Sequence, residues 1–366
     1  MQGDSTMKVL NVVGARPNFI KIAPIVEQMK TTPEIHGMLV HTGQHYDQGM
    51  SDIFFQELGI PRPEIHLGVG SGTHAEQTAR VLTAFEGVCL AQKPDWVVVV
   101  GDVNSTMACT LVAAKLQIPV AHVEAGLRSN DRTMPEEINR IVTDSLADVL
   151  FTTSRDADEN LKHEGIDPSK IYFVGNVMID TLLKHRERAQ SLGKSTENYA
   201  LVTLHRPSNV DDPAVFGEIL EALREIAEEM SVIFPIHPRT AKRISEFGLE
   251  TGKICMTKPH GYLEFLNLTS QAKVVLTDSG GLQEETTIMG IPCLTLRNNT
   301  ERPVTITHGT NIMTGTNRNR ILTGFRRVIN GEWHPSGPPE LWDGHAAERI
   351  VRVIKESGPR PGSRPN

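Results

Sequence analysis

Short apolar runs alternate with longer amphipathic stretches along almost all of the 366 residues, and this alternation constrains the fold more than any other feature. The runs are rich in β-branched residues, which is typical of buried strands, and the stretches between them have the three-to-four spacing of helices. Such alternation predicts an α/β fold with doubly wound parallel sheets. In the first half it predicts strands at 8–13, 38–42, 96–100, 120–123, 149–152 and 171–174, and helices at 49–58, 73–91, 105–116 and 135–147.

The pattern restarts after a polar segment at 191–198. A chain of this length exceeds one comfortable hydrophobic core, so two domains are expected. We predict an N-terminal Rossmann-like domain at 7–175, a C-terminal one at 176–343 and a disordered tail at 357–366. The second half has predicted strands at 199–204, 232–236, 253–256, 273–276 and 293–296, and helices at 213–230, 262–268, 282–289 and 344–356.

Charge and apolar content narrow the class of protein. Acidic residues (44) outnumber basic ones (37), whereas binding to nucleic acid or a membrane surface requires a basic surplus. The longest strongly apolar run, 96–100, is far shorter than the ~20 residues that span a bilayer, and no signal peptide is expected. The four cysteines lie far apart, so neither a disulfide framework nor a CxxC zinc site is expected. These features predict a cytoplasmic protein without a nucleic-acid or membrane partner.

Doubly wound sheets bind ligands outside the carboxyl ends of their strands, so the active site is expected in the cleft between the two domains. Arg16 and Lys21 follow the first strand and suit an anion at a helix N-terminus, although a plain turn with a solvated arginine fits equally well. Asp102 follows the strand at 96–100, where an Asp either faces a ligand or caps a helix.

Two further carboxylates occupy comparable positions. Glu124 ends the strand at 120–123, and Glu136 opens the helix at 135–147. One surface carboxylate is usually unrelated to function, but three on strand-end loops, with Asp102, indicate a shared site. Paired carboxylates in a closed cleft have pKa values driven apart, which supplies acid and base roles at neutral pH.

Histidines follow two successive strands of the second half. His205 lies beside Arg206 after the strand at 199–204, and His237 follows the strand at 232–236. A lone histidine is usually structural, whereas two at neighbouring strand ends beside an arginine indicate contact with an anion.

The strongest local signal is a turn of small residues, Ser279-Gly280-Gly281, between a strand and a helix. Exposed backbone N–H groups at a helix start suit a diphosphate, although a tight connection that merely needs glycine is the alternative. Glu285, in the helix that follows, suits ribose hydroxyls, and Arg302 supplies another cation after a later strand.

Taken in order, these residues resemble the non-hydrolysing UDP-N-acetylglucosamine 2-epimerases. The resemblance extends from about residue 7 to residue 352, and the ordered set of motifs is highly specific although each motif is modest alone. The set comprises Gly14-Ala-Arg-Pro, His41-Thr-Gly-Gln-His45, Gly101-Asp102 and the segments 122–128, 135–140, 203–206, 278–285 and 300–303.

The resemblance implies a GT-B-like architecture in which two Rossmann-like domains form a homodimer subunit and the last helix, at about 344–356, crosses back to the first domain. It implies interconversion of UDP-GlcNAc and UDP-ManNAc, by elimination of UDP to a 2-acetamidoglucal and re-addition, for cell-surface polysaccharide precursors. This reaction needs no cofactor and no metal, in keeping with the absence of GxGxxG, Walker and HExxH motifs from the sequence.

The resemblance also implies roles for the candidate residues. The catalytic set, in which acid and base are not distinguished, is Asp102, Glu124, Glu136 and His205. The set that binds the UDP-sugar, with Glu285 on the ribose, is Arg16, Lys21, His237, Ser279, Gly280, Gly281, Glu285 and Arg302.

Two segments depart from bacterial family members where those members build an allosteric UDP-GlcNAc site. Those members carry Arg and often Gln where this chain has Tyr46-Asp47, and Arg-Glu-Asn near Pro207-Ser208. Because Pro207 and Ser208 lack the charge that such a site uses, no activation by substrate is expected. The same changes suit another substrate, such as a UDP-diacetamido uronic acid, and a GT-B glycosyltransferase is the remaining alternative.

Overall fold

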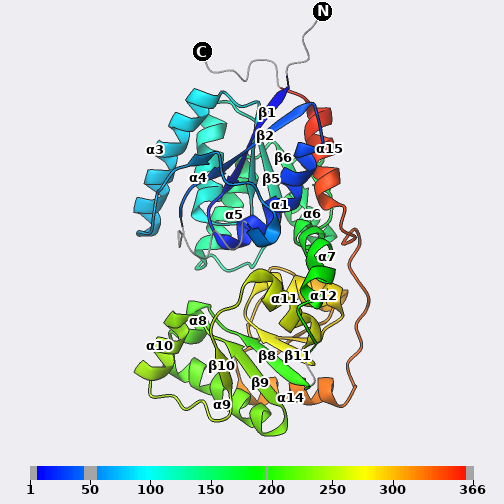
Figure 1. The fold of residues 1–366 in the computed structure, drawn as a ribbon. Helices are drawn as coiled ribbons and strands as arrows, with labels where there is room; N and C mark the ends of the chain where they lie inside the picture. Colours follow the sequence, from blue (N-terminus) through cyan, green and yellow to red (C-terminus); the bar gives the residue numbers. More distant parts are fainter. Residues whose placement is uncertain (1–5, 45–55, 195–196, 360–366) are drawn as a thin grey trace, which may run out of the picture. The chain divides into compact units, whose positions relative to one another are not determined.

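The computed structural model describes residues 6–44, 56–194 and 197–359, apart from the side chain of Arg16. The chain divides into two compact units, Met1–Thr181 with Glu340–Asn366 (unit 1) and Leu182–Pro339 (unit 2). Each unit is built on one parallel sheet flanked by helices (Figure 1). The two sheets confirm the predicted α/β fold class.

The described residues of unit 1 form a seven-stranded sheet in the order β3-β2-β1-β4-β5-β6-β7. Strand β4 is buried along its whole length, from Trp96 to Val100, because a parallel sheet is covered on both faces. The strands are β1 (Met7–Val13), β2 (Ile35–His41), β3 (Ile65–His66), β4 (Trp96–Val100), β5 (Val120–Ala125), β6 (Val149–Thr152) and β7 (Ile171–Phe173).

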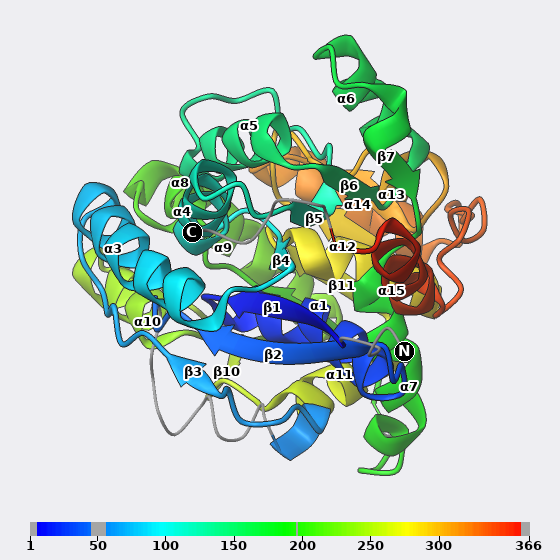
Figure 2. The same ribbon diagram turned by 90° about the horizontal axis from the view of Figure 1, so that it is seen from above.

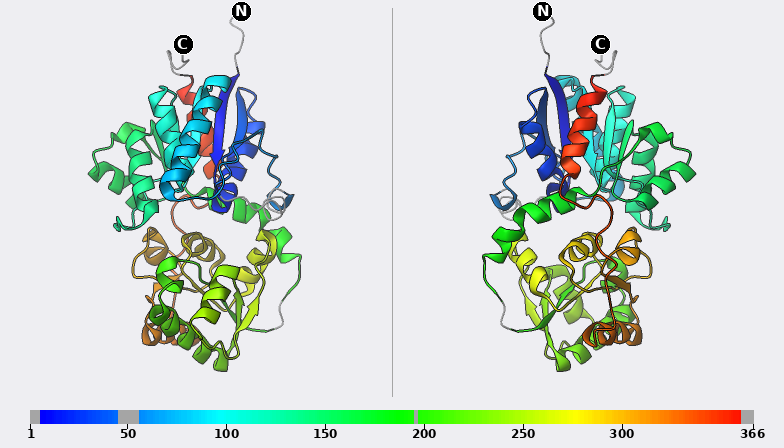
Figure 3. Two further views of the ribbon diagram at one scale, coloured as in Figure 1. Left: turned by 90° about the vertical axis from the view of Figure 1, so that its left-hand side faces the viewer. Right: turned by 90° about the vertical axis from the view of Figure 1, so that its right-hand side faces the viewer.

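Helices cover both faces of this sheet (Figure 2). Helix α4 contacts α3 and α5, and α15 packs against α1, as the red and dark-blue helices in Figure 3 show. The predicted helix at 49–58 lies mostly outside the described residues. The helices are α1 (Arg16–Lys30), α3 (His74–Gln92), α4 (Asn104–Lys115), α5 (Pro135–Leu146), α6 (Arg155–His163), α7 (Val177–Gln190), which continues into unit 2, and α15 (Ala346–Ser357).

Unit 2 has a sheet in the order β10-β9-β8-β11-β12-β13. Its strands are β8 (Tyr199–Thr203), β9 (Ser231–Pro235), β10 (Cys255–Thr257), β11 (Val274–Thr277), β12 (Cys293–Thr295) and β13 (Asn311–Met313). Its helices are α8 (Pro207–Val210), α9 (Pro213–Glu229), α10 (Pro238–Glu246), α11 (Tyr262–Gln271), α12 (Gly280–Met289), α13 (Val304–Thr307) and α14 (Arg318–Ile329). The prediction that Gly280 and Gly281 form a turn was wrong, because both residues already belong to α12.

Each sheet has one point at which the strand order reverses. It lies between β1 and β4 in unit 1 and between β8 and β11 in unit 2. Open α/β sheets bind ligands outside the carboxyl ends of the strands at such a switch point. Each unit therefore has its own cluster of candidate polar residues at its switch point.

Candidate active site

Gly101, directly after β4, is the centre of the polar cluster in unit 1. Its φ is +68°, and a Cβ atom there would lie 3.0 Å from Lys21 Nζ, 3.3 Å from Asn18 Nδ2 and 3.4 Å from Glu124 Oε2. Asn18 Nδ2 also donates a hydrogen bond to the carbonyl of Val100, over 2.9 Å. Glycine thus allows helix α1 and the ends of β4 and β5 to bring these side chains together.

Glu124 has an unusual backbone for a residue within a strand. Its φ is +73°, and the pairing of β5 with β6 shifts register between Val123 and Ala125. The left-handed conformation is strained for a residue with a side chain, and such strain clusters at active sites. Glu124 is buried and forms an ion pair with Lys21, which is also buried. Lys21, predicted to bind substrate, therefore has Glu124 as a partner.

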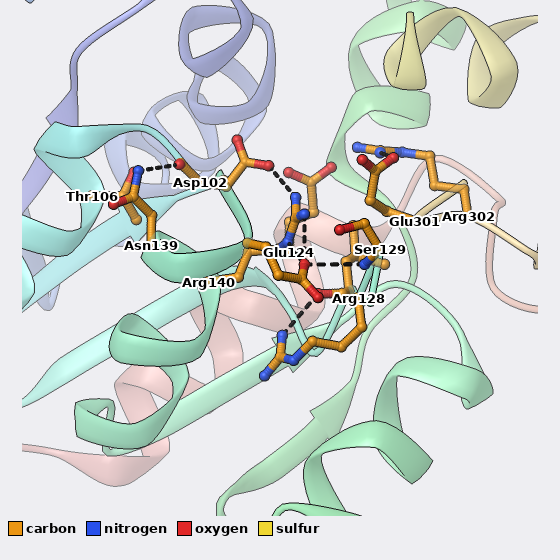
Figure 4. A network of polar contacts seen from close by, with 12 residues as sticks. Asp102, Thr106, Glu124, Arg128, Ser129, Asn139, Arg140, Glu301 and Arg302 are labelled. Atoms are coloured by element: carbon orange, nitrogen blue, oxygen red, sulfur yellow. Dashed lines mark hydrogen bonds and ion pairs between the residues drawn. The ribbon is translucent and has the colours of Figure 1, made fainter. Parts of the chain in front are cut away.

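Asp102 is not a helix cap, which settles the alternative raised by the sequence. The N-cap of α4 is Val103, and no side chain caps that helix. The Asp102 carboxylate instead accepts a hydrogen bond from Arg140 Nη1 of α5 (Figure 4). The side chain of Asp102 remains 28% exposed. Asn139 Nδ2 donates to the backbone carbonyl of Asp102 over 2.8 Å. Asp102 is thus held at both its backbone and its carboxylate.

Glu137 holds Arg140 in place. Arg140 Nη2 and Nε lie 2.7 and 3.0 Å from Glu137 Oε2, and the N–H groups of Ser129 and Asn130 donate to the same carboxylate over 3.0 and 2.9 Å. Burial raises the pKa of Glu137, but these N–H groups and the Arg140 charge outweigh it and leave the pKa below its ordinary value. Sequence reasoning missed both residues, although their i,i+3 spacing in a predicted helix was a signal.

Glu136 lies in the first turn of α5 with an exposed side chain. Within the described parts of the chain, no hydrogen bond or ion pair joins Glu136 to Asp102 or Glu124. Arg16 is the first residue of α1. The structure therefore brings Asp102 and Glu124 to one edge of the sheet and leaves Glu136 on the neighbouring helix.

Asp278 organises the corresponding edge of unit 2. It is fully buried after β11, and its carboxylate accepts hydrogen bonds from the backbone N–H groups of His205 and Arg206. His205 Nδ1 lies 2.8 Å from Asp278 Oδ1, while the imidazole is 58% exposed. Burial raises the pKa of Asp278, but His205 and the N–H groups hold it below its ordinary value. When the ring is neutral, its proton lies on Nδ1, which leaves Nε2 as a base.

The sequence predicts an anion site at the start of α12. Ser279 is the N-cap, and the first N–H groups of a helix have no partner within it. A Cβ atom on Gly280 would lie 2.4 Å from Arg302 Nη1, so glycine allows the guanidinium to approach the first turn of α12, to which Gly281 also belongs. Arg302 is buried, and its Nε lies 2.8 Å from Glu284 Oε1.

Further charges surround Arg302. Arg297 donates two hydrogen bonds of 2.8 Å to Glu301. Neither residue was among the candidates chosen from the sequence. Burial raises the pKa of Glu301, but Arg297, Arg302 and Arg206 outweigh it and hold the pKa well below its usual range. Burial and then the charge of Glu284 raise the pKa of Glu285 to about 8, so this carboxyl is protonated at neutral pH.

His237 is exposed at the end of β9 and has a structural partner. Its Nδ1 accepts a hydrogen bond of 3.2 Å from the N–H of Arg239 and so caps α10. The predicted position at a strand end is correct, and the neutral ring carries its proton on Nε2.

The described residues have neither a metal-binding cluster nor a membrane-spanning helix. No group of three or more His, Cys, Asp or Glu residues among them has an arrangement that could hold a metal ion. None of the helices that the structure describes is both long and apolar enough to cross a membrane.

Comparisons with known proteins identify the chain's relatives. Residues 27–355 match the family described as UDP-N-acetylglucosamine 2-epimerase. The UDP-N-acetylglucosamine 2-epimerase of Methanocaldococcus jannaschii is 44% identical over 95% of this chain and 99% of its own length. The UDP-2,3-diacetamido-2,3-dideoxy-D-glucuronate 2-epimerase of Pseudomonas aeruginosa is 43% identical, with the same coverage of both chains. A crystal structure of the M. jannaschii enzyme in complex with UDP-GlcNAc and UDP matches with a TM-score of 0.88 and 44% identity, and covers 96% of this chain and 100% of that one.

The two doubly wound sheets, with polar clusters at their switch points, define a GT-B-like α/β protein. The chain belongs to the UDP-N-acetylglucosamine 2-epimerase family of isomerases, as its motifs predicted.

Proposed function

We propose that the protein interconverts UDP-GlcNAc and UDP-ManNAc by inverting carbon 2 of the sugar. The observation that carries this proposal is the pair of carboxylates at the ends of β4 and β5, Asp102 and Glu124, each bonded to a cation. Further support comes from relatives named for this activity, one of which was crystallised with UDP-GlcNAc and UDP.

The proposed reaction is an elimination followed by a re-addition. A base takes the proton from carbon 2, a C1–C2 double bond forms, and the C1–O bond breaks with its electron pair on the β-phosphate of UDP. UDP then adds back to C1 while a proton reaches the opposite face of carbon 2. The sequence is redox-neutral, and carboxylates beside C1 stabilise the positive charge that develops as UDP departs.

Inversion requires proton-transfer groups on two faces of the sugar, because one side chain does not reach both. Asp102, partly exposed and oriented by Arg140, and Glu124, paired with Lys21, are proposed for these roles. The exposed Glu136 and His205 complete the proposed catalytic set.

Unit 2 is proposed to hold UDP throughout the cycle, because loss of UDP would end it. The N–H groups at the start of α12 and the Arg302 guanidinium suit the diphosphate. His237 and Arg16 are proposed as further phosphate contacts. Since its pKa of about 8 keeps Glu285 protonated at neutral pH, this carboxyl both donates to and accepts from ribose hydroxyls.

A second substrate is included in the test, because the P. aeruginosa relative, which is 43% identical, is named as the 2-epimerase of a UDP-diacetamido uronic acid. The experiment is incubation of UDP-GlcNAc, and separately of that uronic acid, in deuterated water with NMR detection. Deuterium at carbon 2 with UDP still attached supports a 2-epimerase and identifies its sugar. Reaction only after an acceptor is added would indicate a glycosyltransferase, and no exchange with either sugar would refute the proposal.

A further inference from the structure

A buried ion pair, His122 with Asp144, bridges the two strand ends that carry the carboxylates. His122 of β5 is fully buried, and its Nδ1 lies 2.6 Å from Asp144 Oδ1 while its Nε2 lies 2.9 Å from the carbonyl oxygen of Gly101. Asp144 Oδ2 accepts a hydrogen bond of 3.1 Å from the N–H of Gly126.

Both ring nitrogens of His122 face groups that only accept. One is a carbonyl and the other a carboxylate, so the bond to the Gly101 carbonyl needs a proton on Nε2. Burial raises the pKa of Asp144, but His122 and Arg128 outweigh it and keep the pKa below its ordinary value. Arg128 lies 2.8 Å from Asp144 and also pairs with Glu164, and these are the charged side chains within ion-pair distance of the His122–Asp144 pair or of Arg128 among the described residues.

The pair acts on the backbone next to the candidate catalytic residues. Gly101 is held on both sides by β5, since its N–H donates to the carbonyl of Val123 over 3.1 Å and its carbonyl accepts from His122. Asp102 follows Gly101 directly. On the other strand end, the N–H that Asp144 binds belongs to Gly126, two residues after Glu124.

We propose that His122 and Asp144 are positioning residues that fix Asp102 and Glu124 relative to each other for proton transfer. This inference rests on the proposed function. Neither residue touches the substrate in this account, and their effect passes through the peptide groups of Gly101 and Gly126. A displacement of about 1 Å at a reacting group costs on the order of a hundredfold in rate.

Two substitutions separate the two bonds of the histidine. The amide of His122→Gln reaches the place of Nε2 and keeps the donor to Gly101, whereas the amide of His122→Asn reaches the place of Nδ1 and keeps only the bond to Asp144. We expect kcat to fall about a hundredfold in His122→Asn and less than about tenfold in His122→Gln. The affinity for UDP, measured by calorimetry, stays within about twofold in both, because the proposed UDP contacts lie in unit 2 except for Arg16 at the start of α1.

Asp148→Ala is the matched control for lost stability. Asp148 Oδ2 accepts a hydrogen bond of 3.0 Å from the N–H of Val120 at the opposite end of β5, so this variant loses a backbone contact on the same strand away from the site. Equal losses of kcat in the two His122 variants, or a loss in His122→Asn no greater than in Asp148→Ala, would overturn the inference. If His122→Asn does not fold, the ¹⁵N spectrum of the unaltered protein decides, because an Nε2 atom without a proton leaves the Gly101 carbonyl without this donor and would also overturn the inference. A wild-type protein without exchange on any UDP-sugar would instead refute the proposed function itself.

Discussion

Glu285 offers a quantitative test of the buried charges in unit 2. Its pKa is raised from 4.5 to about 8, first by burial and then by the neighbouring charge of Glu284. Substitution by Gln keeps the shape of the protonated carboxyl and removes its titration. The predicted effect is therefore on how the free energy of unfolding depends on pH.

The sign follows from which state holds the proton. Between about pH 4.5 and 8 the unfolded chain releases the Glu285 proton and the folded chain keeps it, so the stability present at low pH is lost as the pH rises. Each pKa unit corresponds to about 1.4 kcal/mol, so the wild-type protein loses about 2.5 kcal/mol from this group between about pH 5 and 7. Glu285→Gln does not have this loss.

Urea unfolding of the wild type and Glu285→Gln across this pH range measures the difference directly. The stability gap should widen in favour of the variant by about 2.5 kcal/mol. Glu221→Gln, an exposed position on α9, is the control and should leave the pH dependence unchanged. Parallel curves for wild type and Glu285→Gln would show that the carboxyl is ionised in the folded protein and would refute the reasoning.

Three other predictions concern turnover and binding. Asp102→Asn, Glu124→Gln and Glu136→Gln should each lower kcat by about a hundredfold or more with unchanged circular dichroism, and near-native rates in all three would remove the proposed proton transfer. Gly280→Ala puts a Cβ atom 2.4 Å from Arg302 Nη1 and should weaken UDP binding about tenfold by calorimetry; unchanged affinity would exclude the start of α12 from the UDP site. Initial rates should depend hyperbolically on UDP-GlcNAc, and a lag with UDP-ManNAc that traces of UDP-GlcNAc abolish would contradict the expected lack of activation.

The sheets could be predicted where the local pattern is strong. The run of β4 is buried on both faces and contains four consecutive valines, so its sequence alone indicates a strand. The three residues of β13 are too few to form a pattern, and pairing with β12 is what makes them a strand. Helix α10 was missed for a related reason, since most of its nine residues are polar and only two are buried.

The sequence could predict where the candidate residues lie in the fold, but it could not predict which side chains they bond to. Asp102 and His205 follow strands, and strand ends are visible in the sequence. The residues that hold them are remote, since Arg140 is 38 positions from Asp102 and Asp278 is 73 from His205. Such pairs form only when the sheet brings its strand ends together. The segment with Tyr46-Asp47, which bears on activation, lies outside the described residues.

In the proposed reaction, UDP leaves carbon 1 of the sugar and returns to it within one enzyme-bound cycle. UDP-GlcNAc with ¹⁸O in the bridge between C1 and the β-phosphorus tests this claim most directly, because the freed β-phosphate rotates before UDP adds back. If UDP is released and re-added, ¹⁸O moves into non-bridging β-phosphate positions, as followed by ³¹P NMR, at a rate comparable to epimerisation. Epimerisation with the label retained entirely in the bridge would contradict this claim.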